Sequence, residues 1–205
     1  MKIGIIDYGS GNFTSVWNAV GSLSKEITRI TKKEDFNGCS HIILPGVGAY
    51  GAAANKIFSL DLYDTLHNHV LNKKVPFLGI CVGMQLLSEK GFEHGEHSGF
   101  GWVKGNVKVI EFPNMELPLP HMGWNSLTNM NNSPLFKDIE NDATFYFVHS
   151  YFLQLETTEI KTVNVEYGIT FPAALSLENI HGVQFHPEKS QFYGMKLLKN
   201  FIKLC

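Results

Sequence analysis

Short, mostly apolar runs recur along the chain and predict a set of buried strands. These runs lack the alternation of apolar and polar residues that marks a strand with one face in water. Continuous runs of this kind are typical of parallel sheets that helices cover on both faces. The runs occupy residues 2–6, 41–44, 75–80, 145–148 and 181–185.

Segments with apolar residues at helical spacing follow the early strands. In the first of them Val16, Val20 and Leu23 fall three or four positions apart. Alternation of strands and helices over the first 90 residues predicts βαβ units. We therefore expect an α/β fold with an open, mostly parallel sheet and helices on both faces. The helical segments are residues 12–24, 52–71 (as one helix or two), 82–88 and 193–204.

The second half of the chain has a different pattern. Residues 91–105 are rich in Gly and His, and residues 111–120 are rich in Pro. Beyond the prolines strands dominate, which predicts an antiparallel section of sheet in the C-terminal half. Because no sharp change of composition separates the halves, we expect a single domain over residues 1–205. The additional strands are predicted at residues 107–112, 144–153, 161–167 and 173–177.

Composition narrows the classes of protein that fit. The 205 residues carry a net charge of −2, with 44% hydrophobic and 18% charged residues, so no basic surface for non-specific nucleic-acid binding is expected. The first strand meets Asp7 too early for a secretion signal, and no apolar run approaches the ~18 residues of a membrane helix. We expect a cytoplasmic protein with reduced thiols.

Cysteine and histidine spacing gives no metal site. The 3 cysteines, Cys39, Cys81 and Cys205, are too scattered for a disulfide framework or a Cys-x-x-Cys site. His94 and His97 are three residues apart, but no carboxylate or Cys completes a recognisable ligand set. We expect no metal and no cofactor.

The strongest candidate for chemistry is Cys81, where an apolar strand enters Gly-x-Cys-x-Gly and then a short apolar helix. This is the nucleophile-elbow pattern with Cys in place of Ser. Such a turn strains the nucleophile's backbone, and side chains in place of Gly79 and Gly83 would collide. The helix start favours a thiolate and leaves the Val82 N–H free to bind an oxyanion. The alternative is a buried structural cysteine between two turn glycines.

A thiol nucleophile needs a base and a group that orients the base. His186 follows an apolar run and precedes Pro187 and Glu188. In an extended chain residues two apart point the same way, so His186 and Glu188 can share a face. By itself, His-Pro-Glu could equally be an exposed turn. His67 and His69 lie in a polar helical stretch and are expected at the surface.

Two glycine-rich loops follow other strands. Gly46 and Gly48 come directly after the second run, where a neighbouring strand's loop could supply a further oxyanion donor. Without the elbow, this loop would be a plain turn at a strand end. The loop at residues 7–12 contains Gly-x-Gly but lacks a third glycine, and Asp7 would repel a pyrophosphate, which excludes a dinucleotide site.

These motifs together resemble the class I glutamine amidotransferases, which have a flavodoxin-like fold. The resemblance rests on Gly-Ile-Cys-Val-Gly-Met-Gln, Pro-Gly-Val-Gly and His-Pro-Glu-Lys-Ser. Within that family, the chain is similar to the glutaminase subunits of imidazole glycerol phosphate synthases. The narrower similarity lies in the N-terminal Ile-Ile-Asp-Tyr-Gly-Ser-Gly-Asn and in residues 117–125, 145–151 and 182–190.

The resemblance implies a role for several residues. Cys81 would be the nucleophile, His186 the general base and Glu188 its orienting carboxylate. The Val47 peptide and the Val82 N–H would form the oxyanion hole, and the Val47 contribution is thought to depend on the partner subunit. The residues implied to hold glutamine are Gly46, Gly48, Gln85 and the backbone of His149, Ser150 and Tyr151.

The resemblance also implies a partner, a (β/α)8-barrel cyclase subunit in a heterodimer, with Asn12 and Trp124 at the interface. The chain would hydrolyse glutamine through a Cys81 thioester and pass ammonia to the cyclase, which makes imidazole glycerol phosphate and aminoimidazole carboxamide ribotide in histidine biosynthesis. Three alternatives stay open. They are a paralogous amidotransferase of surface-sugar biosynthesis, a Cys hydrolase or peptidase on the same elbow fold, and a binding module without activity.

Overall fold

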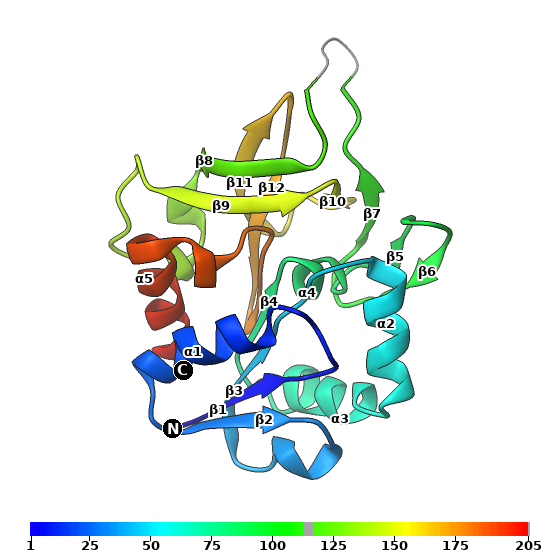
Figure 1. Cartoon of the computed structure of the whole chain (residues 1–205), viewed down its shortest axis with the longest axis vertical. Coiled ribbons are helices and arrows are strands. Elements are labelled where there is room, and N and C mark those ends of the chain that lie inside the picture. Colours follow the sequence, from blue (N-terminus) through cyan, green and yellow to red (C-terminus); the bar gives the residue numbers. More distant parts are fainter. Residues whose placement is uncertain (113–116, 205) are drawn as a thin grey trace.

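A computed structural model describes residues 1–112 and 117–204 (Figure 1). Within these residues the main sheet has a parallel part and an antiparallel edge. Parallel pairing gives both edges of each inner strand a partner, and the apolar runs supply side chains that can be buried on both faces. The parallel strands are β1 (Lys2–Ile6), β2 (Ile27–Ile30), β3 (Cys39–Leu44), β4 (Phe77–Ile80) and β13 (Ile180–Val183). The antiparallel edge is formed by β11 (Lys161–Tyr167) and β12 (Ile169–Leu177).

The strand order is β11-β12-β13-β4-β3-β1-β2. The chain therefore changes direction across the sheet after β2, so β1 and β3 are neighbours although β2 lies between them in sequence. In doubly wound sheets ligands bind at such a switch point, outside the carboxyl ends of the strands. The loops that follow β1, β3, β4 and β13 all leave from that edge, which brings together the motifs noted in the sequence.

Helices cover both faces of the main sheet, as Figure 1 shows. The helix α1 (Phe13–Leu23) and the C-terminal α5 (Gln191–Ile202) lie on one face and contact each other. The helices α2 (Tyr50–Ser59) and α3 (Tyr63–His67) lie on the other face. The predicted helical segment at residues 52–71 thus splits into two α-helices, followed by a turn of π-helix (Asn68–Asn72).

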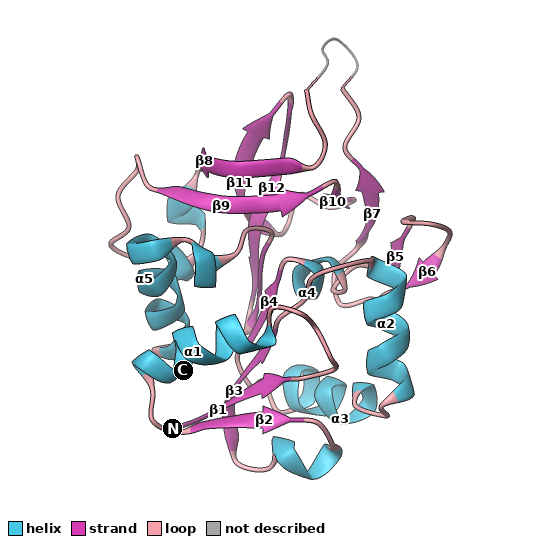
Figure 2. Cartoon of the chain, viewed as in Figure 1, coloured by secondary structure: helices cyan, strands magenta, loops and turns pink. Residues whose placement is uncertain are grey.

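Smaller sheets flank the main one. In Figure 2 the paired strands β8 (His121–Ser126) and β9 (Thr144–His149) lie above α5, apart from the strands at the centre of the main sheet. A further sheet, in the order β10-β7-β5-β6, contains short strands. Its members are β5 (Lys90–Gly91), β6 (His97–Ser98), β7 (Gly105–Val109) and β10 (Tyr151–Leu155).

The structure confirms the α/β fold with a mostly parallel sheet and an antiparallel section, but several local predictions were wrong. The predicted strand at 144–153 bends at Ser150, because β9 pairs with β8 whereas β10 pairs with β7. The strands β2 and β8 were not predicted, since Arg29 and the Gly and Asn residues of β8 interrupt any apolar run. His69 is buried rather than exposed, and its Nδ1 bonds the Thr65 carbonyl at 2.8 Å.

The helix expected at residues 82–88 is a single turn, α4 (Val82–Gln85). Beyond Gln85 the carbonyls of Leu86, Leu87 and Ser88 accept hydrogen bonds from the backbone of residues 100–103. These tertiary hydrogen bonds replace the ones that a longer helix would have made. The 3-10 turns of the described chain are Lys33–Phe36, Met130–Asn132, Pro134–Phe136 and Pro187–Lys189.

Candidate active site

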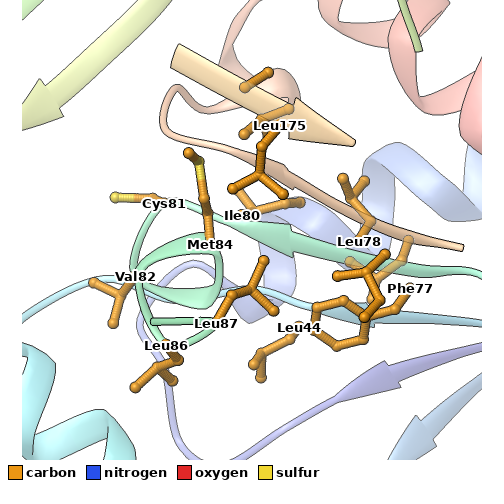
Figure 3. Close-up of a cluster of buried hydrophobic side chains, with 14 of the residues drawn as sticks. Leu44, Phe77, Leu78, Ile80, Cys81, Val82, Met84, Leu86, Leu87 and Leu175 are labelled. Carbon is orange, nitrogen blue, oxygen red and sulfur yellow. The ribbon is translucent and has the colours of Figure 1, made fainter. Parts of the chain in front are cut away.

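Cys81 occupies a sharp turn between β4 and α4. Its backbone has a φ of 54° and a ψ of −109°, in the region that favours glycine and is strained for other residues. The Cys81 N–H donates to the Val183 carbonyl at 2.7 Å, which ties the turn to β13. In Figure 3 the Cys81 sulfur points away from the apolar cluster that contains Leu44 and Phe77. The turn thus presents the thiol at the carboxyl edge of the sheet.

The two glycines of the elbow are required by packing. A Cβ on Gly79 would overlap the carbonyl oxygen of Gly83, and a Cβ on Gly83 would overlap the carbonyl oxygen of Leu44. Gly46 is constrained in the same way, because its Cβ would lie 2.7 Å from the Tyr8 hydroxyl oxygen. The Gly-x-Cys-x-Gly turn and the loop after β3 are therefore packed tightly against each other.

His186 and Glu188 form a buried pair beside the elbow. The His186 Nδ1 lies 2.8 Å from the Glu188 Oε1, and both side chains are 0% exposed. The sequence predicted that they share a face of an extended chain; His186 is extended, but Pro187–Lys189 forms a 3-10 turn. The turn shortens the path along the chain and lets the carboxylate reach back to Nδ1. The opposite ring nitrogen, Nε2, has no hydrogen bond of standard geometry to any described residue.

The environment of His186 favours its charged form. Burial lowers the pKa of His186, but contacts with Cys81 and with Glu188 outweigh burial and raise the pKa above its ordinary value. A histidine that is cationic at neutral pH beside a thiol stabilises the thiolate. The three side chains can therefore hold a thiolate–imidazolium pair with a carboxylate behind it.

Cys81 opens into a pocket of about 490 Å³ at the carboxyl edge of the sheet. Of the residues expected to hold glutamine, Gly48, Gln85, His149, Ser150 and Tyr151 line it, whereas Gly46 packs behind the wall. Both proposed oxyanion donors, Val47 and Val82, also line the pocket. The further lining residues are Ala49, Glu93, His94, Pro120 and Val148.

Buried amides hold one wall of this pocket. The Gln85 Nε2 donates to the Tyr151 carbonyl at 3.0 Å and to the Gln184 Oε1 at 3.1 Å. The Gln184 Nε2 in turn lies 3.7 Å from the Cys81 sulfur, to which it donates. Gln184 did not emerge from the sequence, although it stands two residues before His186, and the same two-residue rule would have placed both on one side of the chain.

The N–H of Val47 is engaged in this structure. It donates to the Oγ of Ser10 at 3.1 Å, so it does not serve as an oxyanion donor in this conformation. The N–H of Val82, at the first position of α4, has no partner within its own helix because every helix leaves its first N–H groups unpaired. Ser10 is a second residue to which the sequence assigned no role in the site.

The two residues expected at the partner interface differ in exposure. Trp124 is 48% exposed and lies on the outer face of β8, as an interface residue requires. Asn12 is 4% exposed, and its Nδ2 donates to the Glu188 Oε1 at 3.2 Å. In this structure Asn12 therefore supports the carboxylate beside His186 rather than facing outward.

The described part of the chain holds neither a cluster of metal ligands nor a membrane-spanning helix. Among residues 1–112 and 117–204, no group of three or more His, Cys, Asp or Glu side chains is placed to hold a metal ion. In the same part of the chain, no helix combines the length and the apolar character needed to cross a membrane.

Comparison with known proteins identifies the family. The sequence model of the family of class-I glutamine amidotransferases matches residues 4–204. A solved glutamine amidotransferase superposes with a TM-score of 0.77 at 17% identity, covering 99% of this chain and 98% of that one. Another glutamine amidotransferase, from Thermotoga maritima, superposes with a TM-score of 0.66 at 16% identity, covering 92% of this chain and 76% of that one. At such identities these two structures establish the fold.

Curated relatives are far more similar in sequence. Imidazole glycerol phosphate synthase subunit HisH of Leptospira borgpetersenii is 39% identical, covering 98% of this chain and 100% of its own length. The HisH subunit of Methanocaldococcus jannaschii is 43% identical, covering 98% and 99%. The HisH subunit of Desulfitobacterium hafniense strain Y51 is 44% identical, covering 98% and 93%. The chain therefore belongs to the class-I glutamine amidotransferases and, among them, to the family of imidazole glycerol phosphate synthase subunit HisH.

Proposed function

We propose that this chain is the glutaminase subunit of a cytoplasmic imidazole glycerol phosphate synthase and forms a heterodimer with a (β/α)8-barrel cyclase subunit. The observation that carries the proposal is the position of Cys81 on a strained turn beside the buried His186–Glu188 pair, with its thiol at a pocket. The family and its whole-length relatives in histidine biosynthesis support the same conclusion.

The first half-reaction forms a thioester. The Cys81 thiolate attacks the side-chain carboxamide carbon of glutamine, and the carbonyl oxygen becomes an oxyanion. The N–H groups of Val82 and, once it has turned, Val47 stabilise that oxyanion. His186 donates the proton on Nε2 to the nitrogen of this tetrahedral intermediate, the C–N bond breaks, and ammonia leaves while the Cys81 γ-glutamyl thioester remains.

The second half-reaction restores the enzyme. His186, now neutral, takes a proton from a water molecule that attacks the thioester carbon. The C–S bond breaks, glutamate leaves, and the thiolate–imidazolium pair forms again. The sum is glutamine plus water giving glutamate plus ammonia. Glu188 accepts from Nδ1 throughout, so it keeps Nε2 turned toward the reacting atoms.

The cyclase partner has two roles in this proposal. Ammonia in neutral water is largely protonated and then lacks a nucleophilic lone pair, so it must pass directly to the acceptor on the cyclase. That acceptor is a ribulosylated aminoimidazole carboxamide nucleotide. The partner also completes the oxyanion hole, since Val47 is bonded to Ser10 in the free chain. Removing one oxyanion donor costs ~10²–10³ in rate, so an incomplete hole would suppress wasteful hydrolysis.

The alternatives from the sequence are less well supported. A surface-sugar amidotransferase would share the glutaminase chemistry, but the curated relatives described above carry the histidine-pathway name over the whole chain. The assignment as a peptidase does not explain why buried amide side chains form a wall of the pocket beside the thiol. A binding module does not account for the charged, fully buried His186–Glu188 pair.

One experiment tests the proposal directly. The chain is produced with and without a histidine-pathway cyclase, and glutamate formation is measured together with imidazole glycerol phosphate. We expect slow hydrolysis by the isolated chain and a rise of at least about 100-fold in the complex. Cys81→Ala should abolish both products from glutamine yet leave ammonia-dependent synthesis by the complex. A complex that forms product from glutamine despite Cys81→Ala would refute the proposed nucleophile.

A further inference from the structure

Two buried histidines outside the triad contact each other at the wall of the pocket. His121 on β8 and His149 on β9 stand directly opposite in the strand register, and the His121 Nδ1 lies 3.1 Å from the His149 Nε2. The residues are 3% and 7% exposed. Neither side chain takes part in the proposed mechanism, so the pair needs an explanation of its own.

The partners of the two rings determine which nitrogens carry protons. The His149 Nδ1 lies 2.8 Å from the Tyr151 carbonyl oxygen, which can only accept, so Nδ1 is protonated. In a neutral ring Nε2 is then an acceptor, and the His121 Nδ1–H donates to it. The Asn125 Nδ2 lies 3.4 Å from the remaining nitrogen of His121. The hydrogen bonds therefore run in one direction, from Asn125 through both rings to Tyr151.

The surroundings keep both rings neutral and fixed. Burial lowers the pKa of His121 to about 4 and that of His149 to about 3. The His121 ring also stacks between two aromatic rings, those of Phe147 at 4.6 Å and Tyr167 at 4.1 Å between centroids. A ring held on both faces can point its Nδ1–H in only a narrow range of directions.

The chain of hydrogen bonds ends on the pocket wall. The Tyr151 carbonyl accepts from His149 and also from the Gln85 Nε2 at 3.0 Å. Ser150, between β9 and β10, is the bend at which the backbone passes from one sheet to another. The Ser150 carbonyl accepts from the backbone N–H of Ile110 at 2.9 Å, whereas the Tyr151 carbonyl accepts from the side chains of His149 and Gln85. The His149 ring closes it by bonding a carbonyl two residues ahead in its own chain.

We propose that His121 is a positioning residue for glutamine, since it orients the His149 ring and thereby holds the Ser150–Tyr151 backbone in the shape that binds the substrate. This rests on the proposed function, because it assumes that glutamine occupies the pocket of Cys81. The strand that carries His121 on its inner face carries Met122 and Trp124 on its outer face, 61% and 48% exposed. The proposed partner surface and the glutamine pocket thus share one strand.

A matched pair of substitutions isolates the hydrogen bond. In His121→Asn the amide nitrogen stands two bonds from Cβ, as Nδ1 does, and can still donate to His149. His121→Leu has nearly the same branched shape but no donor, so the His149 Nε2 is left buried and unpaired. His41→Leu is a control, since His41 is also buried but bonds the Leu204 carbonyl, away from the pocket. All variants are tested in complex with the cyclase partner.

We expect His121→Leu to raise the KM for glutamine roughly 5- to 50-fold, the effect of leaving one buried acceptor unpaired. The kcat should change less than about 3-fold, because the wall binds substrate and transition state alike. His121→Asn should keep KM within about 3-fold of the wild type. His41→Leu should lower the thermal unfolding midpoint without changing KM. An unchanged KM in His121→Leu, or an equal rise in His41→Leu, overturns the role of His121.

A measurement without turnover separates this inference from the proposed function. Histidine ¹⁵N NMR spectra of the protein should report a neutral His149 protonated at Nδ1 in the wild type and in His121→Asn, and a changed Nε2 signal in His121→Leu. A cationic His149, or the same His149 signals in all three proteins, would contradict the hydrogen-bond chain. A wild-type complex without glutaminase activity would refute the proposed function and the substrate role together, whatever the spectra.

Discussion

The backbone N–H of Val47 donates a 3.1 Å hydrogen bond to the side-chain oxygen of Ser10. The Ser10 hydroxyl donates a hydrogen bond to the Asn12 Oδ1 at 2.7 Å, and the Asn12 Nδ2 donates to the Glu188 Oε1. One line of hydrogen bonds therefore joins the loop after β3 to the carboxylate that orients His186. As long as it holds, the Val47 N–H is withheld from any oxyanion formed at Cys81.

The first prediction concerns this contact. Ser10→Ala removes the acceptor and so favours conformations in which the Val47 N–H is free to turn. A buried hydrogen bond contributes about 1 kcal/mol, so the glutaminase rate of the isolated chain should rise roughly 3- to 10-fold. Initial rates of glutamate release measure it. In the partner complex the glutaminase rate of the variant should match that of the wild type.

A serine outside this line of hydrogen bonds provides the control for that substitution. Ser22 is exposed on α1, and its hydroxyl donates to the Ala19 carbonyl of the same helix, so Ser22→Ala should leave the isolated rate unchanged. An isolated rate of Ser10→Ala at or below the wild-type value would show that Ser10 supports the site through Asn12 instead of restraining Val47.

The elbow should not tolerate a methyl group. Gly83→Ala places a Cβ on the Leu44 carbonyl oxygen, a backbone atom that cannot move without disturbing β3. Overpacking of this kind costs about 1–3 kcal/mol, measured as the free energy of unfolding in urea. Gly21→Ala on α1 is the control; its Cβ would lie 3.2 Å from the end of the Ile27 side chain, which can yield. Equal stability of the two variants would argue against a tightly packed elbow.

Glu188 should support catalysis by keeping His186 charged. Glu188→Gln removes the carboxylate that helps to raise the pKa of His186, so less imidazolium forms at neutral pH. We expect kcat in the partner complex to fall by at least about 100-fold, comparable with the loss of an orienting group in other triads. Asn12→Ala, which removes a second donor to Glu188 but keeps the carboxylate, should cost less than about 10-fold. A Glu188→Gln enzyme of near-normal kcat would exclude an orienting role.

Stability should fall in mild acid. Burial lowers the pKa of His121, His149 and His181 below 6.5. As the pH falls below about 6.5, these histidines take up protons in the unfolded chain but stay neutral in the folded chain. The free energy of unfolding therefore decreases until the pH reaches the pKa values of the folded chain, about 3 to 4. Each such group contributes a slope of roughly 1 kcal/mol per pH unit. Because the pKa of His186 is raised, its contribution to the free energy of unfolding changes above pH 6.5, outside this window.

Urea unfolding between pH 7 and pH 4.5 tests this dependence. His181→Asn removes one buried titrating ring, distant from the pocket, and should flatten the slope by about 1 kcal/mol per pH unit. A free energy of unfolding that stays level across this range would contradict the neutral state assigned to the buried rings.

The outer face of β8 should bind the partner. Trp124 lies 48% exposed there, and large aromatic residues at the centre of an interface commonly contribute 2 kcal/mol or more. Trp124→Ala should weaken the heterodimer by roughly 30-fold or more, as titration calorimetry would report. Phe192→Ala is the control, because Phe192 on α5 is 69% exposed but lies outside β8. Equal losses of affinity for both variants would place the contact elsewhere.

The sequence by itself determined the alternation of strands and helices, the elbow and the identity of its cysteine. Buried strands need continuous apolar runs, and a sharp turn with a side chain at its centre needs glycines around it. Both constraints act over a few neighbouring residues and can be read locally. The nearness of His186 and Glu188 is local as well, because they are two positions apart, and the 3-10 turn at Pro187–Lys189 lets the carboxylate reach Nδ1.

Tertiary structure decided what depends on segments distant in sequence. The strand β8 has no apolar run and is held by pairing with β9, and α4 stops after Gln85 because residues 100–103 take over its carbonyls. The engagement of Val47 by Ser10 depends on two loops that meet only when β1 and β3 lie side by side. Hydrogen bonds between such segments leave no periodic trace in a sequence, because each partner can be any residue that offers a donor or an acceptor in the right place.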